Sequence, residues 1–249
     1  MKSQCCAEPG QRCYTKDDSW AVCRYGCTPG PHFEDETAAK WACKELGERT
    51  PGKVEVELPV AKLPSWAATK CTKGFGDCSK TNCCLAPGTQ CYEKSKGGWA
   101  ACRAECMAGP DPRDLDAAPW SCEVLGPRTP GMAEIVPIWN MKPADWVAGA
   151  CSRHGQDCSS TRCCAEEGMQ CYEKVPGWAT CKPSCSPGPD PIDLDGEWWS
   201  CNMVGMRTPG IGKEPDTTAM AVPGWVGVQC SKGGDCSKQR CCAGEGMQC

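Results

Sequence analysis

Residues 151–181 read CSRHGQDCSSTRCCAEEGMQCYEKVPGWATC and hold six cysteines around one adjacent pair, Cys163 and Cys164. The spacers between successive cysteines are six, four, zero, six and nine residues long. Adjacent cysteine pairs also begin at Cys5, Cys83 and Cys241, so the pattern returns every 78 to 80 residues. A fixed period of this kind indicates a tandem array of one small unit.

The composition agrees with small units that are held by disulfides. Leu, Ile, Val and Phe make up only about a tenth of the 249 residues, too few for one large hydrophobic core. The 27 cysteines indicate a disulfide scaffold, which persists in an oxidising compartment, so we expect a secreted or cell-surface protein. The net charge is −4 with Lys and Arg spread through the chain, and no apolar run is long enough for a membrane span; neither nucleic acid nor a membrane span is expected.

The cysteine spacing resembles that of the inhibitor cystine knots, or knottins. Spacing alone leaves many pairings open, and the resemblance implies pairing of the first cysteine with the fourth, the second with the fifth and the third with the sixth. The implied bridges are Cys71–Cys84, Cys78–Cys91 and Cys83–Cys102 in the second repeat, and Cys151–Cys164, Cys158–Cys171 and Cys163–Cys181 in the third. Two further cysteines follow each set at fixed offsets, and we expect them to pair as Cys106–Cys122 and Cys185–Cys201.

These features predict a small disulfide-rich fold, a tandem array of cystine-knot β-hairpin units, each with a short helix and a connector containing Pro and Trp. The expected boundaries are a partial repeat over 1–52, complete repeats over 53–131 and 132–210, and a partial repeat over 211–249. Residues 91–102 and 171–181 have aromatic residues on both sides of a Gly-rich or Pro-Gly centre, which favours a hairpin. Residues 36–47, ETAAKWACKELG, contain good helix formers and end on a Gly, so the short helix is expected there, and after Asp116 and Asp195 in the later repeats.

The connectors between units are also regular. Each begins with an identical RTPG, at 49–52, 128–131 and 207–210, and carries a Trp five residues before the next cysteine: Trp66, Trp146 and Trp225. Flexible linkers are Gly/Ser-rich and indifferent to such placement, so we expect semi-rigid connectors with these rings largely buried for inter-repeat packing. Residues 53–60, KVEVELPV, are expected to add a strand.

Residues for catalysis are scarce. The two histidines, His32 and His154, stand at different positions of their repeats, and no Ser-His-Asp set, P-loop or dinucleotide fingerprint occurs. We expect no enzymatic activity, no cofactor and no metal site, since the cysteine spacings do not match paired zinc clusters. The acidic cluster Asp190, Asp193 and Asp195 partly resembles a calcium loop; turn formation explains it better, and weak calcium binding stays open.

The chain has 11 Trp against two Phe. Trp20, Trp99 and Trp178 recur at one place in their repeats, where they either fill the small unit or stack on sugar rings. Residues 168–181, GMQCYEKVPGWATC, resemble the C-terminal half of fungal-type cellulose-binding modules, which implies stacking on sugars by these rings. The candidate carbohydrate-binding residues are Tyr92, Trp99, Tyr172 and Trp178. The whole repeat also resembles cysteine-rich tandem repeats of secreted or cell-surface proteins in dinoflagellate algae.

The regular connectors favour a non-enzymatic, secreted structural protein that forms a disulfide-stapled rod or fibre in an extracellular hair, extrusome, matrix or wall. Its partners would be copies of itself or neighbouring repeats. One alternative is a multivalent protein that binds cellulose or another cell-wall polysaccharide. Another is a knottin-type inhibitor or toxin. Under the implied pairing Cys6, Cys13 and Cys241 lack partners, which indicates a window on a longer array.

Overall fold

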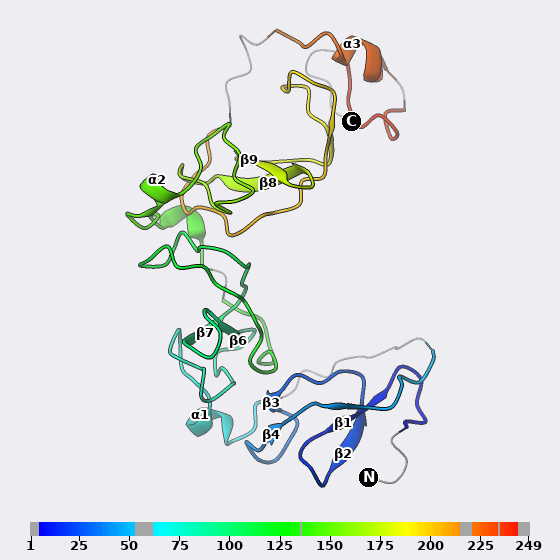
Figure 1. The fold of residues 1–249 in the computed structure, drawn as a ribbon, viewed down its shortest axis with the longest axis vertical. Coiled ribbons are helices and arrows are strands. Elements are labelled where there is room, and N and C mark those ends of the chain that lie inside the picture. The colour runs from blue at the N-terminus through cyan, green and yellow to red at the C-terminus, as the bar shows by residue number, and fades with distance from the viewer. Residues whose placement is uncertain (1–4, 53–61, 135, 215–220, 234, 244–249) are drawn as a thin grey trace. The chain divides into compact units, whose positions relative to one another are not determined.

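The computed structural model describes residues 5–52, 62–134, 136–214, 221–233 and 235–243 (Figure 1). The chain divides into two compact units, one formed by residues 1–106 with 120–136 and the other by 107–119 with 137–249. Loop 107–119 of the second repeat therefore belongs to the same unit as the third repeat. The strand expected over 53–60 lies outside the described residues. Within the described part of the chain, no helix is long and apolar enough to cross a bilayer.

One antiparallel hairpin forms the centre of each of three repeats. The pairs are β1 (Arg12–Thr15) with β2 (Ala21–Arg24), β6 (Gln90–Glu93) with β7 (Ala100–Arg103), and β8 (Gln170–Val175) with β9 (Trp178–Lys182). In every hairpin a cysteine of the first strand lies opposite a cysteine of the second, as Cys171 lies opposite Cys181. The hairpins expected over 91–102 and 171–181 are confirmed.

The helix expected over 36–47 is wrong. This segment holds β4 (Lys40–Trp41), which pairs with β3 (Gly30–Pro31), and β5 (Glu45–Leu46), which pairs with β1. The strands β10 (Gly188–Pro189) and β11 (Trp198–Trp199) repeat the β3–β4 pair in the third repeat.

A backbone conformation explains why no helix forms there. Cys43 has a φ of 53°, and its equivalents Cys122 and Cys201 have φ of 57° and 55°. This left-handed conformation does not continue a right-handed helix. The disulfides Cys27–Cys43, Cys106–Cys122 and Cys185–Cys201 attach each of these residues to the loop that precedes it.

The short helices lie in the connectors instead. They are α1 (Ala67–Lys70), α2 (Val147–Ala150) and α3 (Val226–Gln229), each one turn long and each ending directly before the first cysteine of a repeat. A 3-10 turn, η1 (Ile138–Asn140), precedes α2. The first helical residue is buried in all three cases, at Ala67, Val147 and Val226.

The disulfide pairing departs from that of the inhibitor cystine knot. Cys78–Cys91 and Cys158–Cys171 pair as expected, and so do the appended bridges Cys106–Cys122 and Cys185–Cys201. The expected bridges Cys71–Cys84, Cys83–Cys102, Cys151–Cys164 and Cys163–Cys181 are wrong. The structure joins Cys71–Cys83, Cys84–Cys102, Cys151–Cys163 and Cys164–Cys181. The order is therefore first with third, second with fifth and fourth with sixth.

The register of a short parallel pairing explains the exchange. Thr72 lies opposite Cys84, and the Thr72 amide donates to the Cys83 carbonyl at 3.0 Å, which places Cys71 beside Cys83. Adjacent residues in extended backbone point to opposite sides. Cys83 accordingly packs with Ala67 of α1, whereas Cys84 packs with Ala100 of β7. The adjacent cysteines thus fasten the helix on one side and the hairpin on the other.

The same exchange changes which cysteines lack a bridge at the two partial repeats. Cys6 pairs with Cys23 and Cys241 pairs with Cys230, although both were expected to lack partners. Cys13, as expected, carries no disulfide to a described residue, and Cys242 also carries none.

Candidate functional site

A buried tryptophan with two cations over its ring lies beside every hairpin. Trp41, Trp120 and Trp199 are at most 2% exposed. The first cation directly follows the first hairpin strand in the first two repeats and is the next-to-last residue of that strand in the third, and the second cation ends the second strand. For Trp41 the distances to the ring centre are 5.3 Å from Lys16 and 4.2 Å from Arg24. For Trp120 they are 5.6 Å from Lys94 and 3.8 Å from Arg103. For Trp199 they are 5.4 Å from Lys174 and 4.0 Å from Lys182. Cations in this geometry are attracted by the electron-rich ring face.

A carboxylate completes the arrangement in the first and third repeats. Asp193 accepts the indole N–H of Trp199 at 2.6 Å and an ammonium proton of Lys174 at 2.9 Å. Asp35 does the same for Trp41 and Lys16, at 2.7 and 2.6 Å. Burial opposes ionisation of Asp35, but these hydrogen bonds outweigh it and lower its pKa.

A second tryptophan packs against the buried one and is half exposed. Trp20, Trp99 and Trp178 are 49%, 44% and 39% exposed, with ring centres 5.6, 5.5 and 5.9 Å from those of Trp41, Trp120 and Trp199. The candidate rings Trp99 and Trp178 therefore each offer surface to solvent.

The candidate residues Tyr92 and Tyr172 are placed differently, since both are only 8% exposed. The Arg128 guanidinium donates to the Tyr92 hydroxyl at 2.7 Å, and Arg207 donates to Tyr172 at the same distance. Polysaccharide binding through Tyr92 and Trp99 requires both rings to be exposed. Tyr92 is buried, so the two rings do not form a shared exposed surface.

These arginines belong to the RTPG segments, to which sequence reasoning assigned no role. Arg207 also donates to the carbonyls of Gly168 and Pro183, at 2.5 and 2.9 Å. The next residue, Thr208, is fully buried and donates to the Cys164 carbonyl at 2.6 Å. Arg49 with Thr50 and Arg128 with Thr129 make the equivalent contacts. We call these contacts of the RTPG arginine and threonine the arginine clamp. The exact repetition of RTPG was the signal in the sequence that could have identified it.

The connector tryptophans Trp66, Trp146 and Trp225 are half-buried, less than expected. Each donates its indole N–H to the backbone carbonyl of an Asp in the preceding repeat. The acceptors are Asp35 at 2.9 Å, Asp114 at 2.9 Å and Asp193 at 3.0 Å. Phe33 also stacks on Trp66 with a 7° interplanar angle. We call the recurring hydrogen bond from the connector tryptophan indole to the Asp backbone carbonyl the junction bond.

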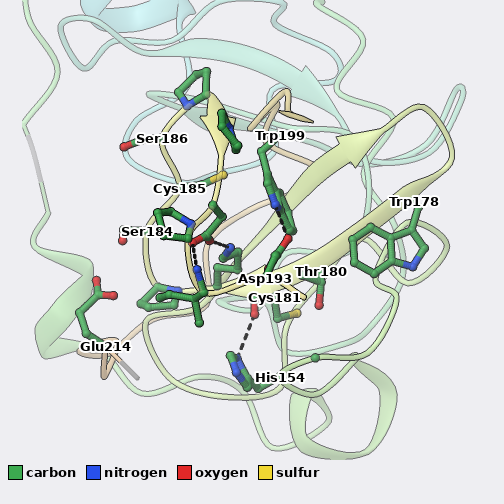
Figure 2. A pocket seen from close by; sticks show the side chains of 18 of the residues that line it. His154, Trp178, Thr180, Cys181, Ser184, Cys185, Ser186, Asp193, Trp199 and Glu214 are labelled. Carbon is green, nitrogen blue, oxygen red and sulfur yellow. Dashed lines mark hydrogen bonds and ion pairs between the residues drawn. The ribbon is translucent and has the colours of Figure 1, made fainter. Parts of the chain in front are cut away.

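A pocket of about 530 Å³ lies beside Trp178 and Trp199 of the third repeat (Figure 2). Trp178 and His154 lie toward one side, and Ser184, Ser186 and Glu214 toward the other. The lining also includes Trp199 with Lys182, whose ammonium forms an ion pair with Asp190. The arrangement joins an exposed aromatic face to hydroxyl and carboxylate groups, which is the general pattern of a small-ligand site.

The other candidate residues are engaged in local contacts. Asp190 pairs with Lys182, while Asp193 and Asp195 pair with Lys174, at 2.9 and 2.5 Å, so lysines occupy the positions that calcium would need. His154 lies against the Cys181 carbonyl at 3.1 Å. His32 is buried and lies 3.8 and 3.9 Å from the sulfurs of Cys27 and Cys43, which are joined to each other and offer no thiolate.

No protein-family model matches the chain, and comparisons with curated proteins and with solved structures found no similar protein. The function is therefore inferred from the contacts of the chain's own residues.

Proposed function

We propose that the chain is a non-enzymatic, secreted structural protein whose repeats are fastened to one another to form a rod or fibre. The observation that carries the proposal is the junction bond, which recurs with acceptor distances of 2.9, 2.9 and 3.0 Å. A protein that only displayed separate binding modules would not need the same contact at each boundary. The many disulfides support an oxidising, extracellular environment.

A second contact accompanies the junction bond. Arg162, with a φ of 55°, donates its Nε–H to the Ala108 carbonyl at 2.9 Å, so it lies against the loop of the preceding repeat. Gly109 has a φ of 125°, and a Cβ atom there would lie 3.2 Å from the Cβ of Arg162. Gly188 and Arg240 show the same approach, again at 3.2 Å. The second and third junctions thus have a hydrogen bond on one side and a close approach of a glycine to an arginine side chain on the other.

The two alternatives differ in what the structure offers them. Multivalent polysaccharide binding retains one exposed ring in each repeat, Trp20, Trp99 and Trp178, since the tyrosines are buried. The knottin inhibitor or toxin rests on a cysteine resemblance whose implied pairing is not the one observed.

Small-angle scattering tests the fastening of the repeats. The oxidised wild-type chain should scatter as a particle of defined shape, whereas the variant Trp66→Ala/Trp146→Ala/Trp225→Ala should scatter as linked, independently moving units. The matched control is Trp139→Ala, which removes a 57% exposed connector ring outside the junction. Wild-type scattering that already equals that of independent units would overturn the proposed function. Negative-stain microscopy over a concentration series then tests assembly, and particles of single chains throughout would remove the fibre.

A further inference from the structure

The pocket of the third repeat depends on one position that differs among the repeats. Glu34, Arg113 and Ile192 occupy it, each one residue before the Asp that accepts the junction bond. Glu34 pairs with Arg24 at 2.7 Å, and Arg113 holds the Asp111 carboxylate through contacts of 2.8 to 3.2 Å. Ile192 is apolar and 42% exposed. It cannot pair with Lys182 as Glu34 pairs with Arg24, nor with Asp190 as Arg113 pairs with Asp111, so it leaves the Lys182–Asp190 ion pair uncovered.

The partly buried charges around the pocket are paired within the protein, and the two remaining lining charges, Glu214 and Arg240, are exposed and of opposite sign. Lys182 is neutralised by Asp190, and Asp193 is occupied by Lys174 and by the Trp199 indole. A strongly charged ligand would have to displace one of these partners and leave a partly buried charge behind. The pocket therefore favours a neutral ligand.

Hydrogen-bonding capacity remains nevertheless. A carboxylate accepts at two oxygens with several lone pairs, so Asp190 and Asp193 can accept further bonds, and Ser184 and Ser186 carry hydroxyls that donate and accept. Trp178, on the other side of the pocket, provides an exposed ring face (Figure 2). A ligand that fits must combine a weakly polar face of C–H groups with a rim of hydroxyls, and a pyranose ring has both.

We propose that this pocket binds a neutral oligosaccharide, with one sugar ring against Trp178 and its hydroxyls directed to Asp190, Asp193 and the two serines. The site is a pocket of the third repeat, bordered by Glu214 and Arg240 of the fourth, and not a flat row of rings shared by several repeats. It does not require the structural role proposed above, because the junction bond of Trp225 uses the Asp193 backbone carbonyl, whereas the ligand would use the Asp193 carboxylate.

Calorimetry and indole N–H resonances of the oxidised full chain test the proposal with four probes: cellotetraose, laminaritetraose, chitotetraose and mannotetraose. At least one should bind saturably and shift the Trp178 resonance. The variant Ile192→Arg, which places the arginine of the second repeat over Asp190, should weaken binding about tenfold or more. The matched control Ile192→Ala keeps the pocket open and should bind as the wild type does.

Position 192 is exposed, so neither variant threatens folding, and an unchanged amide spectrum outside the pocket checks this. Absence of saturable binding by all four probes would overturn the proposal. So would binding that Ile192→Arg leaves unchanged, or retention on insoluble cellulose without binding of any soluble probe, which would indicate a flat surface elsewhere.

Discussion

The first and third repeats bury the same tryptophan under two cations, but they neutralise the second cation from different positions. In the first repeat Arg24 lies over Trp41 and pairs with Glu34 at 2.7 Å and with Asp35 at 3.3 Å, and position 32 is a histidine. In the third repeat Lys182 lies over Trp199, its partner is Asp190 at the position of His32, and Ile192 stands at the position of Glu34. In both repeats a carboxylate from the same turn pairs with the cation, and Glu34 and Asp190 supply it from different positions.

The alternation has a geometric reason. The two positions are the first and third residues of one tight turn, in which the Asp35 amide donates to the His32 carbonyl at 3.1 Å and the Asp193 amide to the Asp190 carbonyl at 2.9 Å. The third residue, Glu34, reaches the cation in the first repeat, and the first residue, Asp190, reaches it in the third repeat. Where the carboxylate is at the first position of the turn, the third position need not carry one. In the third repeat Asp190 supplies the carboxylate, and the third position is Ile192, which lines the pocket.

The largest effect is expected from removal of the buried ring. Trp41→Ala and Trp199→Ala should each destabilise their own repeat by about 3–5 kcal/mol, because each leaves a large cavity. Chemical denaturation of the oxidised chain, with hydrogen exchange of the hairpin amides, measures this. Trp198→Ala, next in sequence but 49% exposed, is the control and should cost less than about 1 kcal/mol. Equal losses for Trp198 and Trp199 would contradict the assignment of the core.

Loss of the RTPG arginine should come next. Arg207→Met removes donors to two carbonyls and to the Tyr172 hydroxyl and should destabilise the third repeat by about 2–3 kcal/mol. Arg49→Met should do the same in the first repeat. Tyr172→Phe, which deletes only one acceptor, should cost about 1 kcal/mol. The same denaturation experiment decides, and an arginine loss no greater than the tyrosine loss would refute the clamp.

A transplant tests the equivalence of the two carboxylate positions. Asp190→His should destabilise the third repeat by about 1–2 kcal/mol, because Lys182 loses its partner. Adding Ile192→Glu reproduces the first repeat and should restore most of this loss, with a coupling free energy of about 1 kcal/mol in a double-mutant cycle. Additive effects would show that the two positions are not interchangeable.

The smallest effect concerns pH. His32 and Arg24 lower the pKa of Glu34 from its ordinary 4.5 to about 2. A lowered carboxyl pKa contributes stability above the unfolded-state value, and this contribution is lost as pH falls from about 4.5 to 2. A carbon-detected NMR titration should therefore give Glu34 a midpoint near 2. Arg24→Met should raise it, and an unchanged midpoint in that variant would exclude the ion pair as a cause.

The sequence predicted contacts that are local and missed those that depend on register. The hairpins and the Cys106–Cys122 and Cys185–Cys201 bridges follow from short spacings, and the structure confirms them. The partners of Cys83 and Cys84 depend on which of two neighbours faces α1, and this is set by the pairing of Thr72 with Cys84. Spacing does not determine that pairing.

The helix and the clamp were missed for related reasons. Helix propensity over 36–47 carries no information on the burial of Trp41 or on the left-handed Cys43, which together require a different backbone. The contacts of Arg128 lie 24 to 40 residues upstream, beyond any periodicity that a sequence displays. Of the candidate site, Trp178 and the acidic cluster that contains Asp190 could be singled out from the sequence, whereas the pocket that brings them together with Ser184 could not.

The disulfides between described residues all join cysteines 11 to 18 positions apart. During synthesis into an oxidising compartment, each of these bridges can therefore close before the following repeat has emerged, since its two cysteines lie close in sequence. The contacts of the RTPG arginine and threonine reach 24 to 45 residues back and the junction bonds 31 to 32, so both follow the local bridges as the chain is made. Such a chain can mature in the order in which it is made, and the number of repeats adds little to the difficulty of folding any one of them.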